Sequence, residues 1–291
     1  MAWRGLSQWP GILRDALLEY FNDKAARMGA ALAYYATFSI APILVILIGV
    51  AGLLFGEEAV RGQVFAEIEG LLGSRSASTI ESMLANIRQQ DADWLATIMG
   101  IALLIVGATG VYVALQDALF MIWGVELKGK SGILNMIKKR GIAFLLVLAS
   151  GSILGVSLLL STILSAALGF FGEILPPPLH SAGVQLLKQI LPFLVATVHF
   201  ALIYKIVPLI PLRWGDVWVG AAVTSVLFNI GKWGIEFYVS RSSVVTIFGA
   251  GSSLVILLLW VYYSSQIILL GAEVTKVYTR RLGSQSEEES N

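Results

Sequence analysis

The chain has 291 residues, of which 57% are hydrophobic and 13% charged, and its mean hydropathy is +0.79. This composition lies outside the usual range of soluble domains and predicts a membrane protein. A net charge of +1, no cysteine and only two histidines argue against a nucleic-acid surface, disulfides, thiolate chemistry and a histidine-built metal site. We therefore predict no metal site and no cofactor, and we name no catalytic residue.

The N-terminal segment has apolar residues at helical spacing. These residues are Ile12, Leu13, Ala16, Leu17, Tyr20 and Phe21, with charged residues of both signs between them. The segment lacks a short apolar core followed by a small-residue cleavage site, so we predict no cleaved signal peptide. We expect residues 1–27 to form a cytoplasmic amphipathic segment that lies on the membrane before the first span.

Long runs with few charges predict six membrane-spanning helices, since about 20 apolar residues cross a hydrocarbon core about 30 Å thick. Their expected bounds are about 28–56, 94–123, 141–172, 189–207, 217–239 and 249–272. The fold class is thus an all-α polytopic membrane protein with a six-helix membrane domain over residues 28–281. The acidic tail, residues 282–291, is expected to be disordered.

Residues 57–93 leave the membrane in this interpretation, because they contain seven acidic residues and three arginines. Apolar residues at helical spacing predict short amphipathic helices on the outer side, between the first and second spans. Such helices could form a lid over the membrane domain. We prefer a connector whose apolar face packs against the bundle.

The distribution of basic residues predicts the orientation. With six spans and a cytoplasmic N-terminus, fourteen of the 20 Lys and Arg fall in inside segments and five fall outside. This excess predicts that both termini are cytoplasmic. The most basic segment is the loop 126–140, which could also bind anionic lipid headgroups, although its role in setting the topology is sufficient to explain it.

The fifth span carries a polar stripe in an otherwise apolar helix. Ser225, Asn229, Lys232 and Glu236 are spaced by four, three and four residues, which places them on one helical face, and Arg241 follows just beyond. Charges inside a membrane are costly and mark binding sites by default. The alternative is a lysine whose stem reaches outward and pairs with Glu236 four residues on. We leave both interpretations open.

Three further residues complete the candidate substrate site. Tyr34 and Tyr35 lie in the small, polar first half of the first span, and Gln266 lies in the sixth span. A helix half of this kind should face protein or water rather than lipid. These side chains are therefore predicted partners for a polar substrate at the fifth-span stripe.

Several segments resemble the YihY/BrkB family of bacterial inner-membrane proteins. They are ALAYYATFSIAP, LQDALFMIWGVE, GKWGIEFYVS and FGAGSSLVILLLWVYYSSQIILLGAEV, and the resemblance covers about residues 20–281. It implies six helices with both ends cytoplasmic. Members have been called ribonuclease BN, a label regarded as mistaken, and have been linked to serum resistance and, in one branch, to movement of lipopolysaccharide precursors. At FGAGSS this chain departs from the YGS-type sequence of the family, so no role is transferred to that turn.

These observations favour an inner-membrane carrier or flippase for an anionic lipid or another polar envelope component. The alternative is a scaffold or envelope-assembly protein that transports nothing. A nuclease is disfavoured, because the acidic residues are scattered over loops and the two histidines lie on different segments. We predict a protein that is not an enzyme, whose partners are the lipid bilayer and anionic lipid headgroups, not nucleic acid. The substrate, the energy coupling and the oligomeric state are left open.

Overall fold

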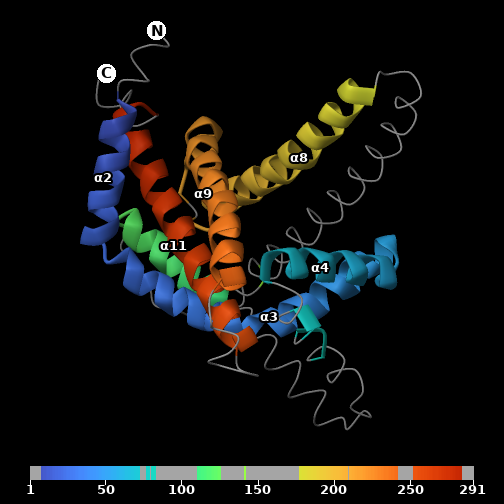
Figure 1. Cartoon of the computed structure of the whole chain (residues 1–291). Coiled ribbons are helices and arrows are strands. Elements are labelled where there is room, and N and C mark those ends of the chain that lie inside the picture. The colour runs from blue at the N-terminus through green and yellow to red at the C-terminus, as the bar shows by residue number, and fades with distance from the viewer. Residues whose placement is uncertain are drawn as a thin grey trace, which may run out of the picture.

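The computed structural model describes residues 8–72, 77–78, 80–82, 110–125, 141, 177–208, 210–241 and 252–283 (Figure 1). Within these ranges the regular elements are helices, and no strand occurs in them. The longer helices are α2 (Trp9–Asn22), α3 (Ala25–Phe55), α4 (Glu57–Leu72), α8 (Pro177–Ile206), α9 (Trp214–Arg241) and α11 (Ser252–Arg281). A further helix covers Gly110–Ile122. The predicted all-α class is confirmed for this part of the chain.

Helices α3, α8, α9 and α11 correspond to the predicted first, fourth, fifth and sixth spans. Helix α8 begins earlier than predicted, at Pro177, because proline fits the first turn of a helix, where a backbone N–H has no intrahelical partner. Helix α11 runs past the predicted end at residue 272 and continues to Arg281. The predicted third span, 141–172, lies outside the described residues except for residue 141.

One helix among the described residues, Leu254–Arg281, is long and apolar enough to cross a membrane. Two shorter apolar helices are Gly110–Ile122 and Ile190–Ile206. The number of spans and the orientation of the chain stay predictions.

The central core joins the helix Gly110–Ile122 to α3, α8, α9 and α11. Its largest fully buried members include Leu119, Ile122, Tyr204, Val217 and Leu269. The amide of a buried glutamine in the same helix, Gln116, donates to the Val207 carbonyl at 3.2 Å and so fixes this helix to the end of α8. The sequence segments that form this core lie far apart in the chain, so the core ties the bundle together.

Helices α9 and α11 approach each other closely at small residues. A Cβ added to Gly220 would lie 1.7 Å from Thr275 Oγ1 and 2.8 Å from the Gly271 carbonyl oxygen. A Cβ added to Gly271 would lie 1.8 Å from Thr224 Oγ1. At Gly220 a Cβ would meet the backbone of α11, and at Gly271 it would meet the side chains of Thr224 and Tyr204, so both glycines allow the two helices to approach closely.

Tyr204 of α8 reaches into this crossing. Its hydroxyl lies 2.7 Å from Thr224 Oγ1 on α9 and donates to the Ile268 carbonyl on α11, also at 2.7 Å. The side chain is 2% exposed, so both bonds are shielded from water. A single hydroxyl therefore links three helices.

Replacing Tyr204 by phenylalanine should lower the free energy of unfolding by about 1–3 kcal/mol, because buried partners lose their hydrogen bond. Thermal unfolding of the detergent-purified protein measures the change. Tyr34→Phe is the matched control, since Tyr34 is 61% exposed, and should leave the unfolding temperature unchanged. Equal unfolding temperatures for Tyr204→Phe and the wild type would show that the hydroxyl does not hold the three helices together.

Helix α4 packs against the end of the bundle formed by the C-terminal half of α3 and the start of α11. Val60 and Val64 of α4 are buried with Ile48, Ile256 and Trp260. The helical residues 77–78 and 80–82 join through buried Ile80, and Arg61 of α4 pairs with Glu81 at 2.9 Å. This packing is what a connector with an inward apolar face would show.

Helix α2 packs along the other end of α11 (Figure 1). Ile12 and Ala16 of α2 are buried against Val274 and Val277 of α11. The predicted helix is therefore present, but half of its apolar face is covered by α11, whereas Leu13, Leu17 and Phe21 remain exposed. The exposed apolar residues remain available for contact with the membrane, and the position of this segment on the membrane stays a prediction.

Candidate functional site

The predicted polar stripe lies on α9, and its inner end is buried. Ser225 has no exposed surface, and its Oγ has no hydrogen-bond partner among the described residues. Asn229 Nδ2 donates to the Ser225 carbonyl at 2.8 Å, and Lys232 is half-buried. Glu236 and Arg241 belong to the same helix, but their side chains are outside the described part of the structure. The proposed pair of Lys232 with Glu236 therefore stays a prediction.

The surroundings of the stripe differ on its two sides. On one side α9 exposes large apolar residues, Ile230, Trp233 and Phe237, each more than half exposed. On the other side Gly231 packs against Tyr263 of α11, since a Cβ at this glycine would lie 1.9 Å from the tyrosine ring. Lys232 thus lies at the border between the buried α11-facing edge of α9 and its exposed apolar face.

The described contacts of the other predicted site residues are with segments other than the stripe. Tyr34 and Tyr35 are 61% and 45% exposed, and the Tyr35 ring packs beside Gly110. Gln266 accepts a hydrogen bond from the Tyr20 hydroxyl of α2, and its Nε2 donates to the Ala26 carbonyl at 3.2 Å. Among the contacts that the structure describes, Gln266 therefore joins α11 to the α2–α3 junction and is not paired with either tyrosine.

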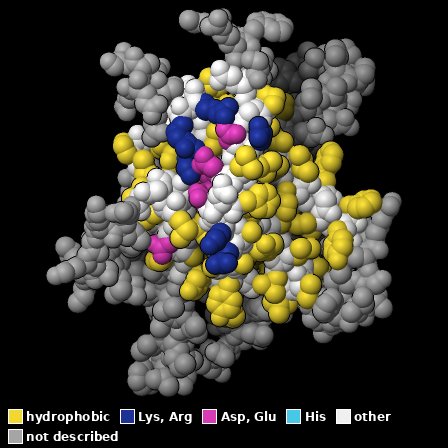
Figure 2. Space-filling model, turned by 90° about the vertical axis from the view of Figure 1, so that its left-hand side faces the viewer, with side chains coloured by type: hydrophobic (Ala, Val, Ile, Leu, Met, Phe, Trp, Pro, Cys, Tyr) yellow, Lys and Arg dark blue, Asp and Glu magenta, His cyan; other side chains and the backbone are white. Residues whose placement is uncertain are grey.

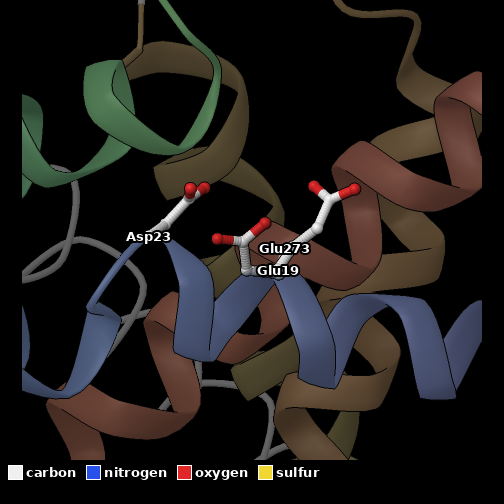
Figure 3. A group of neighbouring side chains, drawn as sticks. All are labelled: Glu19, Asp23 and Glu273. Atoms are coloured by element: carbon white, nitrogen blue, oxygen red, sulfur yellow. The ribbon is translucent and has the colours of Figure 1, made fainter.

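A second group of polar side chains lies where α2 crosses α11, and sequence reasoning missed it (Figure 3). Carboxylate oxygens of Glu19, Asp23 and Glu273 lie within 4.8 Å of one another. Lys276 Nζ lies 2.7 Å from Glu19 Oε2, 3.2 Å from Asp23 Oδ2 and 3.6 Å from Glu273 Oε2. We call these four residues the α2–α11 ionic cluster.

Burial is uneven within the ionic cluster. The Glu273 side chain has no exposed surface, whereas the Glu19, Asp23 and Lys276 side chains are 23%, 29% and 17% exposed. Neither carboxylate oxygen of Glu273 has a hydrogen-bond partner among the described residues. Desolvation of an ionised carboxylate is costly unless hydrogen bonds or charges compensate for it. Glu273 is thus the least satisfied member of the cluster.

Two arginines at the end of α11 extend the contact. Arg280 pairs with Glu19, and Arg281 pairs with Asp15. Residues later in α2 meet residues earlier in α11, so the two helices pack antiparallel. Figure 2 faces the side that carries α2 and shows acidic side chains between basic ones, beside a hydrophobic surface.

The charges around Glu19 lower the pKa of its carboxyl group. Burial alone would raise the pKa of this carboxyl, but hydrogen bonds and charges from Lys276 and Arg280 outweigh burial and hold the pKa below its ordinary value. Glu19 therefore stabilises the contact between α2 and α11 above the pKa of the unfolded chain, and this stabilisation is lost as the pH falls through the folded pKa.

The sequence contains a signal for this cluster. In α2, Asp15, Glu19 and Asp23 are spaced by four residues, and near the end of α11 the basic residues Lys276 and Arg280 have the same spacing. Two complementary charged stripes of equal spacing are typical of helices that pack together. The signal was missed because we assigned Glu273 to the end of the sixth span and the following basic residues only to topology.

The ionic cluster offers oxygen ligands alone. Three carboxylates suit hard cations, whereas the cluster contains no histidine and, like the whole chain, no cysteine. The Lys276 ammonium already lies against all three carboxylates. Our expectation that the chain has no metal site and no enzymatic activity stays a prediction.

The helical architecture, the apolar helix Leu254–Arg281 and the exposed apolar faces agree with the predicted class of helical membrane protein. A family model described as virulence factor BrkB matches residues 16–291, and the chain belongs to this BrkB family. The predicted YihY/BrkB membership is thereby confirmed.

Curated relatives carry the name UPF0761 membrane protein. The one from Alcanivorax borkumensis is 28% identical over 267 residues, which cover 89% of this chain and 58% of the relative. RSc1559 from Ralstonia nicotianae is 28% identical over 283 residues, or 93% of this chain and 60% of the relative. MS0032 from Mannheimia succiniciproducens is 26% identical over 261 residues, or 88% and 85%.

The chain spans about three fifths of the length of the first two of these relatives. The relatives come from bacteria and are named as membrane proteins, which supports the predicted membrane localisation. No solved structure matches the chain.

Proposed function

We propose that this chain is a multi-pass carrier or flippase of the bacterial inner membrane that moves an anionic lipid or another polar envelope component. The observation that carries this proposal is the stripe on α9. A fully buried Ser225 hydroxyl without a described partner and a half-buried Lys232 share one face of an apolar helix. A buried polar group left without a partner costs about 1–3 kcal/mol. A substrate headgroup that passes along this face would supply the partner.

The charge of the stripe favours an anionic substrate. Lys232 offers three N–H donors and a positive charge, and Asn229 adds an amide close to it on the same face. Charge-assisted hydrogen bonds to phosphate or carboxylate are stronger than those between neutral groups. The exposed apolar residues beside the stripe, Ile230 and Trp233, would contact the acyl chains while the headgroup contacts Lys232.

The rival proposal is a membrane scaffold that organises envelope components and moves no substrate. The close packing of α8, α9 and α11 around Tyr204 fits a rigid scaffold as well as it fits the fixed part of a carrier. The two functions differ in what purified protein does in liposomes, where only a carrier moves lipid.

Transport is tested in proteoliposomes that contain labelled anionic phospholipid or labelled zwitterionic phospholipid. We expect the wild type to move the anionic lipid between leaflets, and Lys232→Ala to slow this roughly tenfold or more, since a charge-assisted hydrogen bond contributes about 1.5–3 kcal/mol. Lys232→Arg should retain most of the activity. Arg14→Ala, an exposed cation on α2, is the matched control and should transport like the wild type.

Two results would oppose the proposal in different ways. Wild-type protein that moves neither lipid would favour the scaffold. Wild-type transport that is unchanged in Lys232→Ala would leave a carrier but remove the α9 stripe from its pathway.

A further inference from the structure

The contact between α2 and α11 is rich in charge and poor in buried apolar surface. Of the residues of α2, only Ile12 and Ala16 are buried. In contrast, the three acidic residues in and just after α2 all pair with cations near the end of α11. The pairs are Asp15 with Arg281, Glu19 with Arg280 and Lys276, and Asp23 with Lys276. Charge therefore supplies a large part of what holds α2 in place.

These ion pairs are open to solvent. The side chains that form them are between 17% and 49% exposed. Salt screens such charges, because the screening length falls from about 30 Å at about 0.01 M to about 3 Å at about 1 M ionic strength. A single exposed pair contributes little, but four of them act together on one short helix. The attachment of α2 should therefore weaken as the ionic strength rises.

The turn between α2 and α3 favours release. Helix α2 ends at Asn22 and α3 begins at Ala25, and Lys24 between them has a φ of 56°, in the left-handed region. Lys24 is the one residue other than glycine with a positive φ among the described residues. A residue with a Cβ is less stable in this conformation than in the right-handed one. When α2 leaves α11, Lys24 is free to return to an ordinary conformation.

We propose that α2 is an ionic-strength-sensitive strap, held on the C-terminal end of α11 by ion pairs and released when salt screens them. The strap contacts the turn of α11 on which α9 also packs, since Lys276 pairs with Glu19 and its neighbour Thr275 lies against Gly220 of α9. Release thus removes support from one side of the turn that holds α9, the helix with the polar stripe. The inference does not depend on the transport proposal.

The test measures how fast an introduced cysteine of the detergent-purified full chain reacts with an uncharged maleimide. Ile12→Cys places the thiol on the buried face of α2, so its reaction reports release from α11. We expect it to react at least about fivefold faster at about 1 M than at about 0.01 M potassium chloride, and slowly again after the salt is removed. Leu13→Cys, on the exposed face, should react rapidly at both salt concentrations and corrects for any effect of salt on the chemistry.

A double variant links the salt response to the ion pairs. Arg280→Gln with Arg281→Gln removes two of the four pairs, and both arginines are more than 40% exposed, so the packed part of α11 stays intact. In the Ile12→Cys background this variant should react faster at low salt, and its acceleration by salt should fall from about fivefold to about twofold, because half of the pairs are gone. Arg61→Gln breaks the exposed pair with Glu81 in another part of the structure and is the matched control, which should respond like the parent.

The strap is supported if salt accelerates the reaction at position 12, and not at position 13, and the double variant reduces this acceleration. Two results would overturn it: a reaction at position 12 that is equally slow at both salt concentrations, or an acceleration that is as large in the double variant as in its parent.

Discussion

Replacing Gly220 by alanine is expected to destabilise the protein by about 1–3 kcal/mol, because the new methyl group has no space between α9 and α11. Its Cβ would lie 1.7 Å from Thr275 Oγ1 and 2.8 Å from the Gly271 carbonyl oxygen, which belongs to the backbone and cannot rotate away. Thermal unfolding in detergent measures the loss.

The same helix supplies the matched control. Nothing lies within 4 Å of a Cβ added to Gly234, so Gly234→Ala should be neutral or stabilising by up to about 1 kcal/mol, the difference in helix propensity. Adding Thr275→Ala to Gly220→Ala should restore part of the lost stability, since it removes the nearest clashing atom. If Gly220→Ala and Gly234→Ala behave alike, the close crossing of α9 and α11 is wrong.

Replacing Lys276 by methionine is expected to release α2 from α11. Lys276 is 17% exposed and, among the described residues, is the one cation in contact with all three carboxylates of the ionic cluster, so its loss leaves Glu273, Asp23 and Glu19 to repel one another. Removing one partner of a buried ion pair lowers the free energy of unfolding by about 3–5 kcal/mol. Because Lys276, Glu19 and Asp23 are partly exposed, we expect a loss of about 2–3 kcal/mol here.

Because the chain contains no cysteine, a single introduced cysteine reports the release. Ile12 is fully buried against α11 and Leu13 is 43% exposed. A cysteine at position 12 should react slowly with a maleimide in otherwise wild-type protein and at least tenfold faster with Lys276→Met, since about 1.4 kcal/mol corresponds to a tenfold change. A cysteine at position 13 should react rapidly in both.

A double variant tests whether charge repulsion among the three carboxylates causes the release of α2. Adding Glu273→Gln to Lys276→Met should restore slow labelling at position 12, because it removes one of the three repelling charges. Lys24→Met, an exposed lysine at the α2–α3 turn, should not change labelling. Slow labelling in Lys276→Met itself would mean that the apolar contacts of Ile12 and Ala16 alone hold α2 in place.

Much of the architecture follows from patterns in the sequence. Helical spacing of apolar residues predicts α2, and long runs with few charges predict α3, α9 and α11 to within a few residues at most of their ends. The bounds that differ have local causes. Prolines favour the first turn of α8, and the last turns of α11 remain helical because α2 packs against them and pairs with their charges.

The candidate sites depend on tertiary contacts that spacing alone does not supply. The α9 stripe is predictable, since Ser225, Asn229 and Lys232 lie on one helix, and one face follows from 3.6 residues per turn. The ionic cluster joins residues about 250 positions apart, Glu19 with Lys276 and Glu273. Charge patterns suggest that two such helices attract, but only their antiparallel packing brings these carboxylates together.

The partners of Gln266 likewise could not be predicted from the sequence alone. Its polarity within an apolar helix predicts a partner, and we predicted that Gln266, like Tyr34 and Tyr35, serves a polar substrate at the fifth-span stripe. In the structure the Tyr20 hydroxyl of α2 donates to Gln266, because α2 folds back along α11. A sequence pattern thus identifies which groups need partners, whereas the packing of the helices decides which partners they obtain.

The most direct test of the carrier proposal is a density map, with native mass spectrometry, of the full chain extracted together with its own lipids. We predict one anionic lipid per chain with its headgroup at Lys232 and Asn229, and loss of this lipid in Lys232→Ala but not in Arg14→Ala. A map in which Lys232 pairs only with Glu236, the Ser225 hydroxyl is enclosed by apolar side chains and no lipid headgroup lies on the stripe would contradict it.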